Sequence, residues 1–351
     1  MTIAKSLKIT RMYMIRIIVC WLVLFCANNA VALEYKLSDA ELLASMSYKP
    51  QISEMGTQRP TAFEWMTSAP QNLLSFTKRI DPRENAGWWT GIVLSSAILI
   101  KYDQEIIDES QKYGRKLGLI SDTKHGRETT TIIPWKLQGL DLPIGVPANL
   151  NSVLYSIGDG YPQIGLMGGL LGYGFLAGND HALSVASQNI EALFVTGIIV
   201  QALKRSTGRQ APFVATTPGG KWQWFPNQEE YNKHVPSYDA FPSGHLATVM
   251  ASTTVLAYNY PTHTYIKPVG YSLMAILGFA MLTNGVHWAG DYPVGLAIGY
   301  TAAQVAIARN EKKKITVTSA APLSAQKRLS ESMVLPFADQ QGFGLRYYES
   351  F

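Results

Sequence analysis

The segment FPSGHLAT at residues 241–248 leads from a loop into an apolar run that extends to Tyr258, a pattern that predicts the start of a helix. The first N–H groups of a helix lack partners within it, and with the helix dipole they form an anion site. Gly244 lets a ligand approach the backbone closely, and His245 can carry or release a proton near neutral pH. An ordinary helix N-terminus with an exposed histidine explains the same pattern. Residues elsewhere in the chain must therefore decide between an anion site and an ordinary helix N-terminus.

Apolar segments elsewhere in the chain predict further helices, over Gly160–Asn179, Leu183–Lys204, Pro268–Thr283 and Tyr292–Ile307, and Trp88–Ile100 forms another apolar run. Glycines spaced along the first of these are expected to permit close helix contact: Gly165, Gly168, Gly169 and Gly172. No internal repeat and no heptad pattern is present. The sequence therefore predicts an all-α bundle of about six core helices.

The polar residues fall at the ends of these helices, and short connections favour an up-and-down arrangement. Lys204 ends one helix, His245 begins the next, and His287 and Asp291 lie between the last two. We therefore expect all four at one end of the bundle, beneath the loop 205–240. Asp159, between two glycines, is interpreted as a turn residue.

Three clusters then converge: KRSTGRQAP at 204–212, PSGH at 242–245 and GVHWAGD at 285–291. This set suits phosphoryl transfer without a metal, because one histidine can attack phosphorus while Asp291 orients its ring, and the other can protonate the leaving oxygen. The non-reacting oxygens would be held by Lys204, Arg209, Ser243 and the N–H group of Gly244. The competing interpretations are a solvated helix C-terminus for the cations and a core histidine for His287.

At these residues the chain resembles the superfamily of type 2 phosphatidic acid phosphatases and vanadium-dependent haloperoxidases. The resemblance covers about residues 150–308 and rests on Lys204, the Pro-Ser-Gly-His segment and the His-x3-Asp segment. It implies that His287 is the nucleophile that forms a phosphohistidine, with Asp291 in support and His245 as general acid. It also implies that Lys204, Ser243 and Gly244 bind phosphate.

Two arginines of the family pattern are replaced, one by Ala211 and the other by Met281. Arginine–phosphate pairs are bidentate and charge-assisted, so losing both is expected to lower the rate on the order of 10²–10⁴-fold unless something replaces them. Arg205 and Arg209 are the candidates to replace them from shifted positions.

The first 32 residues resemble a secretory signal: basic residues precede the apolar run Ile17–Phe25, and Ala30-Val31-Ala32 offers a cleavage site. An uncleaved anchor helix is the alternative. Both cysteines, Cys20 and Cys26, lie in this segment, so the mature chain would hold no disulfide, thiol nucleophile or thiolate metal site. Four of the 30 Lys and Arg residues also lie there, which leaves 26 against 25 Asp and Glu, so the charge gives no reason to expect a nucleic-acid partner.

We therefore divide the chain into a signal (1–32), an N-terminal extension (33–85), a phosphatase-like helical domain (86–310, with its motifs at 204–291) and a tail (311–351). Hydrophobic residues make up 47% of the chain and charged residues only 16%, which fits helices at or in a membrane. The apolar runs are close to the roughly 20 residues that a span requires. The site is expected in the periplasm, on a membrane-associated or integral inner-membrane protein.

The predicted function is an exported, metal-independent phosphatase that needs no cofactor. Its substrate would be a lipid phosphate, a polyprenyl diphosphate or a small phosphoester. Two alternatives remain open at this point. One is a vanadate-dependent haloperoxidase, and the other is a non-catalytic relative that serves as an envelope scaffold or ligand binder.

Overall fold

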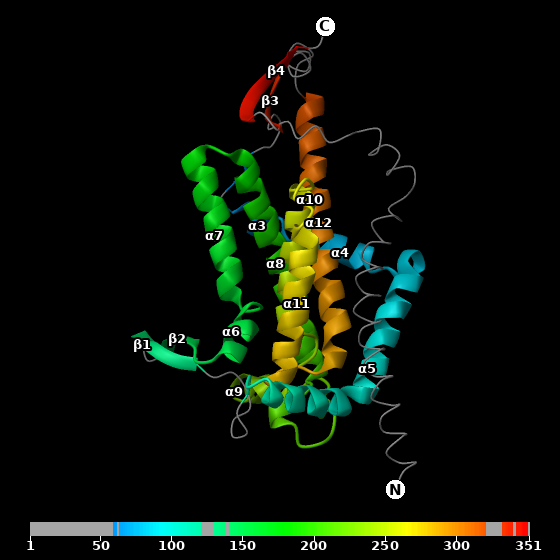
Figure 1. The fold of residues 1–351 in the computed structure, drawn as a ribbon. Coiled ribbons are helices and arrows are strands. Elements are labelled where there is room, and N and C mark those ends of the chain that lie inside the picture. The colour runs from blue at the N-terminus through cyan, green and yellow to red at the C-terminus, as the bar shows by residue number, and fades with distance from the viewer. Residues whose placement is uncertain are drawn as a thin grey trace, which may run out of the picture.

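The computed structural model describes residues 59–61, 63–120, 129–137, 140–320, 332–339 and 342–349. The predicted signal segment lies outside the described residues. Six long helices form the body of the molecule (Figure 1): α5 (Pro82–Lys116), α7 (Gly160–Ala177), α8 (Asp180–Thr207), α10 (Gly244–Asn259), α11 (Ile266–Thr283) and α12 (Tyr292–Ala320). The predicted all-α class is confirmed.

The remaining described elements are short. They are the helices α3 (Glu64–Thr67), α4 (Ala69–Arg79), α6 (Leu150–Ser156) and α9 (Gln228–Lys233), and the 3₁₀ turns η1 (Pro212–Val214), η2 (Val235–Ser237) and η3 (Ala289–Asp291). Two antiparallel hairpins, β1 (Thr129–Leu137) with β2 (Leu140–Pro147) and β3 (Ser332–Asp339) with β4 (Gly342–Glu349), project from the bundle (Figure 1).

The predicted helices over 160–179, 183–204, 246–258 and 268–283 agree with α7, α8, α10 and α11 to within a few residues. The apolar run Trp88–Ile100 lies within α5, and the charged residues that follow it remain helical to Lys116. One boundary was wrong, because α12 continues beyond Ile307 to Ala320 through Glu and Lys residues that favour helix.

Helix α10 lies between α8, α11 and α12 at the centre of the bundle. Small residues bring α12 against it: a Cβ atom at Gly295 or Gly299 would collide with the backbone of Ser243 or Ala247. The predicted close contacts in α7 were wrong, because its spaced glycines face open space among the described residues, namely Gly165, Gly168, Gly169 and Gly172. Close approach by α7 occurs at Gly174 instead, against Leu183 of α8.

The N-terminal helices α3 and α4 are tied to the bundle by a buried ionic network. Arg309 on α12 donates to Glu191 of α8 at 2.6 Å and to Glu64 of α3 at 2.8 Å. Asn72 of α4 donates to the other oxygen of Glu191 at 3.2 Å. Part of the predicted extension therefore forms two short helices that pack on the core.

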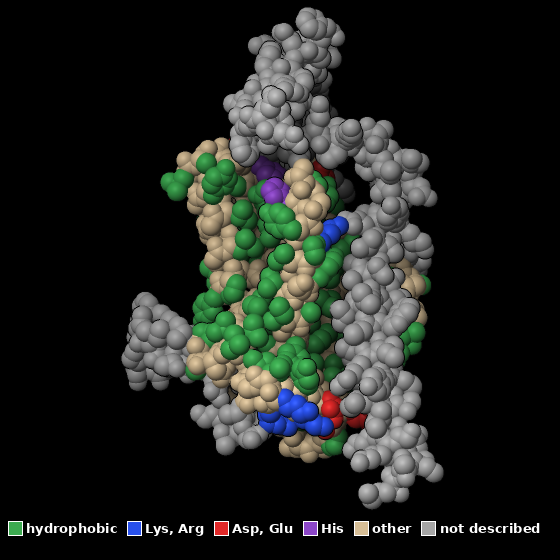
Figure 2. All heavy atoms as spheres, in the orientation of Figure 1, with side chains coloured by type: hydrophobic (Ala, Val, Ile, Leu, Met, Phe, Trp, Pro, Cys, Tyr) green, Lys and Arg blue, Asp and Glu red, His purple; other side chains and the backbone are tan. Residues whose placement is uncertain are grey.

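The flank of the bundle is rich in exposed apolar side chains, and Figure 2 shows them along the middle of the visible face, with Lys, Arg, Asp and Glu gathered mainly near its lower end. The exposed apolar side chains belong chiefly to α5, α7 and α11. They include Val93, Leu94, Ile98, Ile164, Phe175, Leu176, Val269 and Ile276. By length and composition α8 and α11 could each cross a membrane, although most of the apolar stretch of α8 is buried within the bundle.

Candidate active site

The predicted site residues meet at one end of the bundle, the lower end in Figure 1, where α8 ends and α10 and α12 begin. Gly208 ends α8 in the left-handed conformation (φ 54°), which glycine adopts readily. Ser243 caps α10 by accepting the N–H of Leu246 at 3.4 Å, and a cis peptide bond precedes Pro242. The predicted convergence beneath the loop 205–240 is confirmed.

His287 is buried and its ring is held in one orientation. Its Nδ1 lies 2.6 Å from the carbonyl oxygen of Ala240, which can only accept, so Nδ1 carries the hydrogen and Nε2 keeps a lone pair. Burial lowers the pKa of His287 well below its usual value, and the charges of Lys204 and His245 lower it further. The ring is therefore neutral, with a lone pair on Nε2.

Asp291 contributes less directly to this ring than the sequence suggested. Its Oδ2 lies 3.5 Å from His287 Nδ1, but accepts the N–H of Trp288 at 2.8 Å. Its Oδ1 accepts Nη1 of Arg209 at 2.6 Å. Burial raises the pKa of Asp291 to about 6 despite these partners. The backbone carbonyl of Ala240, which no side-chain motif reveals, is the nearer partner of the histidine.

His245 lies beside His287, with 5.5 Å between the ring centroids. Its Nε2 is 3.3 Å from Oδ1 of Asp159, and its ring packs on Tyr155 at 4.6 Å. Asp159 was interpreted as a turn residue, and the structure adds to this a contact with a candidate catalytic histidine. The sequence carries no signal for this contact: a Cβ atom at the adjacent Gly158 would lie 2.5 Å from His245 Cβ, but this close approach is visible only in the structure.

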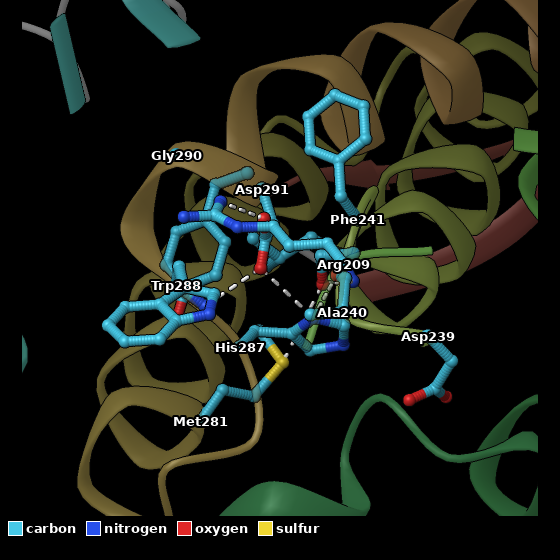
Figure 3. Close-up of polar contacts among 12 residues, drawn as sticks. Arg209, Asp239, Ala240, Phe241, Met281, His287, Trp288, Gly290 and Asp291 are labelled. Atoms are coloured by element: carbon cyan, nitrogen blue, oxygen red, sulfur yellow. Dashed lines mark hydrogen bonds and ion pairs between the residues drawn. The ribbon is translucent and has the colours of Figure 1, made fainter. Parts of the chain in front are cut away.

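Lys204 and Ser243 lie at the same end of the bundle, and both are buried. The Lys204 ammonium lies 3.3 Å from Asp239, whose side chain points away from His287 in Figure 3. Ser243 Oγ contacts Met281 Sδ at 3.7 Å. Met281, which replaces a family arginine, is therefore in contact with a predicted phosphate-binding residue, whereas Ala211 is buried in an apolar cluster with Ala240 and Trp288.

The two arginines proposed as replacements have other partners. Arg205 bonds Gln228 and Asn232 and lies 4.5 Å over the ring of Tyr231, on the outer side of the loop. Arg209 is fully buried: Nη1 bonds Asp291, and Nη2 bonds Asp103 at 2.6 Å and the carbonyl of Gly219 at 2.8 Å. A phosphate contact by Arg209 would have to use Nε, which has no partner among the described residues, or the remaining Nη1 hydrogen.

The arrangement offers a neutral imidazole with a lone pair, a second histidine beside it, an ammonium group and the N-terminus of a 16-residue helix. These are the parts that phosphoryl transfer through a histidine requires. Within the described part of the chain, no group of three or more His, Cys, Asp or Glu side chains could hold a metal ion.

The chain is similar to known proteins over part of its length. Residues 188–315 match the model of the PAP2 superfamily. A lipid A 1-phosphatase from Porphyromonas gingivalis is 32% identical over 62 residues, which are 17% of this chain and 14% of that protein. The crystal structure of LpxE from Aquifex aeolicus matches at 19% identity with a TM-score of 0.35, covering 45% of this chain and 83% of that one. At that TM-score the structural likeness supports no further conclusion.

Proposed function

From the premise that the PAP2 superfamily resemblance is confirmed over residues 188–315, we propose that this chain is an exported, metal-independent phosphatase of phosphomonoesters or diphosphates. The observation that carries the proposal is the His287 ring, whose bond to Ala240 leaves Nε2 as a buried base 5.5 Å from the His245 ring, centroid to centroid. The burial of Lys204 and Arg209 supports this proposal over a solvated helix end for the cations, and the second histidine supports it over a core histidine at His287.

In the first step, Nε2 of His287 forms a bond to phosphorus as the bond from phosphorus to the leaving oxygen breaks. His245 gives its proton to that oxygen. Water then attacks the phosphohistidine while His245 takes up a proton, which releases phosphate and restores both rings. Lys204, Ser243 and the N–H of Gly244 would hold the non-reacting oxygens, with Asp291 stabilising the cationic His287.

The proposed substrate is a phosphorylated lipid. The apolar flank of the bundle and the match to a lipid A 1-phosphatase support a site that works at a membrane surface. The proposed location is the periplasm, with the chain membrane-associated or integral to the inner membrane. A small soluble phosphoester is the second candidate substrate.

The non-catalytic alternative is favoured by one observation. Met281 and Ala211 supply no charge where the family pattern has arginines, and the described contacts of Arg205 and Arg209 do not replace them. The absence of both arginines also weakens the vanadate-dependent haloperoxidase alternative, because tight vanadate binding needs the same cationic side chains as phosphate binding. Dye peroxidation with added vanadate tests it.

The deciding measurement is phosphate release by the purified protein against the His287→Ala variant. The substrates are an aryl phosphate, phosphatidic acid, undecaprenyl diphosphate and lipid A. We expect the variant to lose activity on the order of 10⁴-fold or more. The matched control is His263→Ala, which alters an exposed histidine at the other end of α10. Equal release by wild type and His287→Ala, or no release on any substrate, would overturn the proposal.

A further inference from the structure

A fully buried carboxylate outside the motifs contacts two parts of the candidate site. Asp103 lies on α5, outside the segment that matches the family model. Its Oδ2 accepts Nη2 of Arg209 at 2.6 Å, and its Oδ1 accepts the N–H of Gly290 at 2.8 Å. A surface charge on an amphipathic helix has neither of these partners, so Asp103 has a specific role inside the molecule.

Both partners of Asp103 lead to Asp291. Arg209 donates its other terminal nitrogen to Asp291 at 2.6 Å, and Gly290 is the residue directly before Asp291. Asp291 in turn accepts the N–H of Trp288, the residue directly after His287. Figure 3 shows the Arg209 guanidinium beside the Asp291 carboxylate, with Trp288 and Gly290 around it. Asp103 thus fixes the turn that carries both His287 and Asp291.

Packing leaves these groups little freedom to move. The Arg209 guanidinium carbon lies 4.8 Å from the ring centroid of Trp222 and 5.3 Å from that of Trp288. A Cβ atom at Gly290 would lie 2.5 Å from Ile100 and 2.9 Å from Asp103 Oδ2, so only glycine lets α5 come this close. A rigid support of this kind holds reacting groups in the geometry that fast catalysis needs.

The charge of the cluster also matters. Asp103, Arg209 and Asp291 together carry a net negative charge when both carboxylates are ionised, whereas Arg209 and Asp291 alone would be neutral. A phosphohistidine at His287 is cationic, and a net negative cluster 3.5 Å from its ring stabilises that cation. Asp103 therefore offsets the guanidinium charge that would otherwise oppose the reaction.

We propose that Asp103 is a positioning residue for the histidine phosphatase site, acting on His287 through Arg209, Gly290 and Asp291. The inference rests on the proposed function. It extends the site beyond the matched segment to α5, and it gives Arg209 a structural and electrostatic role in place of direct phosphate binding.

The main variant is Asp103→Asn, which keeps the side-chain shape and removes the charge. We expect kcat for aryl phosphate to fall on the order of 10–100-fold with KM nearly unchanged, because the displaced groups act on the reacting histidine. Arg209→Lys is the second variant: it keeps the charge but cannot bridge two carboxylates, so kcat should fall similarly. The matched control is Asp108→Asn, an exposed aspartate on the same helix, which should leave kcat unchanged.

A purely structural role is separated by titrating the His287 ring with nitrogen NMR in wild type and Asp103→Asn. The groups facing this ring and Asp291 are Lys204, His245, Asp239, Arg209 and Tyr292. The charge of Asp103 is present only above its own pKa of about 6, so we expect the nitrogen shifts of the wild-type His287 ring to change near that pH as Asp103 ionises. This step, and the matching step in the pH profile of kcat, should be smaller in Asp103→Asn. The titration needs no turnover, so it remains decisive if wild type releases no phosphate and the proposed function fails.

Three results would overturn the inference. One is an active wild type whose Asp103→Asn variant matches Asp108→Asn in kcat and pH profile. Another is an unchanged His287 titration in Asp103→Asn. The third is unchanged kcat in Arg209→Lys, which decides the matter if Asp103→Asn does not fold.

Discussion

Two arginines each bridge two carboxylates in this molecule, at different places and with different consequences. Arg209 joins Asp103 and Asp291, all three fully buried, next to the ring of His287. Arg309 joins Glu191 and Glu64, with its own side chain 21% exposed, where α3 packs on α8 and α4 packs on α8 and α12. The same local chemistry supports the reacting groups in the first bridge and attaches the N-terminal helices in the second.

The largest expected effect separates the two bridges by activity. Arg209→Ala and Arg309→Ala each remove the cationic partner of two buried carboxylates, so each should lower the free energy of unfolding by about 3–5 kcal/mol, with Arg309→Ala at the lower end because it is partly exposed. Only Arg209→Ala should also reduce phosphate release by the folded protein, by on the order of 10²-fold or more. Denaturant unfolding and phosphate release per folded molecule measure the two effects.

The control for these variants is Lys233→Ala, which breaks an exposed pair with Glu229 and should change stability by at most about 0.5 kcal/mol. If Arg309→Ala lost activity in proportion to Arg209→Ala, the two bridges would not differ in function.

A smaller effect concerns pH. Burial raises the pKa of Asp103 and of Asp291 from 3.8 to about 6 in the folded protein, so between these values the folded state binds more protons than the unfolded state. Stability should therefore fall as pH rises from 3.8 to about 6, by on the order of 3 kcal/mol for each carboxyl. Denaturant unfolding at several pH values gives this slope.

The bridges again differ under this measurement. Asp103→Asn should reduce the slope and shift the pH profile of phosphate release. Glu191→Gln removes a carboxyl whose pKa is also raised by burial, so it should reduce the slope and leave the activity profile in place. A stability that rises steadily across this pH range would contradict the raised pKa values.

The smallest expected effect concerns the ion pair beside the first bridge. Asp239→Asn removes the carboxylate that lies 3.3 Å from the Lys204 ammonium. An incoming phosphate would otherwise have to displace this carboxylate from Lys204. The inhibition constant for phosphate should fall about fivefold, which corresponds to ~1 kcal/mol. Glu229→Gln, which removes one negative charge from the exposed helix α9 in the same loop, is the control. Weaker inhibition in Asp239→Asn would mean that Asp239 holds Lys204 in place for binding.

The sequence predicts the parts of this site that local patterns mark along the chain. Runs of apolar residues predict the helices. The ends of those helices place Lys204, His245, His287 and Asp291 at one end of the bundle. The motif spacing also predicts the PAP2 resemblance. All of these inferences depend on local patterns that tertiary contacts reinforce.

The parts that sequence did not predict depend on contacts between distant segments. Asp103 lies in a charged stretch that has the composition of a solvated helix face, and its burial follows only from Gly290 and Arg209. Asp159 looks like a turn residue until Gly158 brings it to His245. The nearest partner of His287 is the backbone carbonyl of Ala240, which has no side-chain signature.

The position of Asp103 also has a consequence for how the chain folds. Its two partners are 106 and 187 residues away along the sequence, whereas the bond that orients His287 spans 47. Contacts between such distant residues close large loops, and their entropic cost delays them relative to local structure. The bundle can acquire its helices and its motif loop early, but the site is complete only when α5 docks. Activity should therefore emerge as one of the last events of folding, after most of the helical signal has appeared.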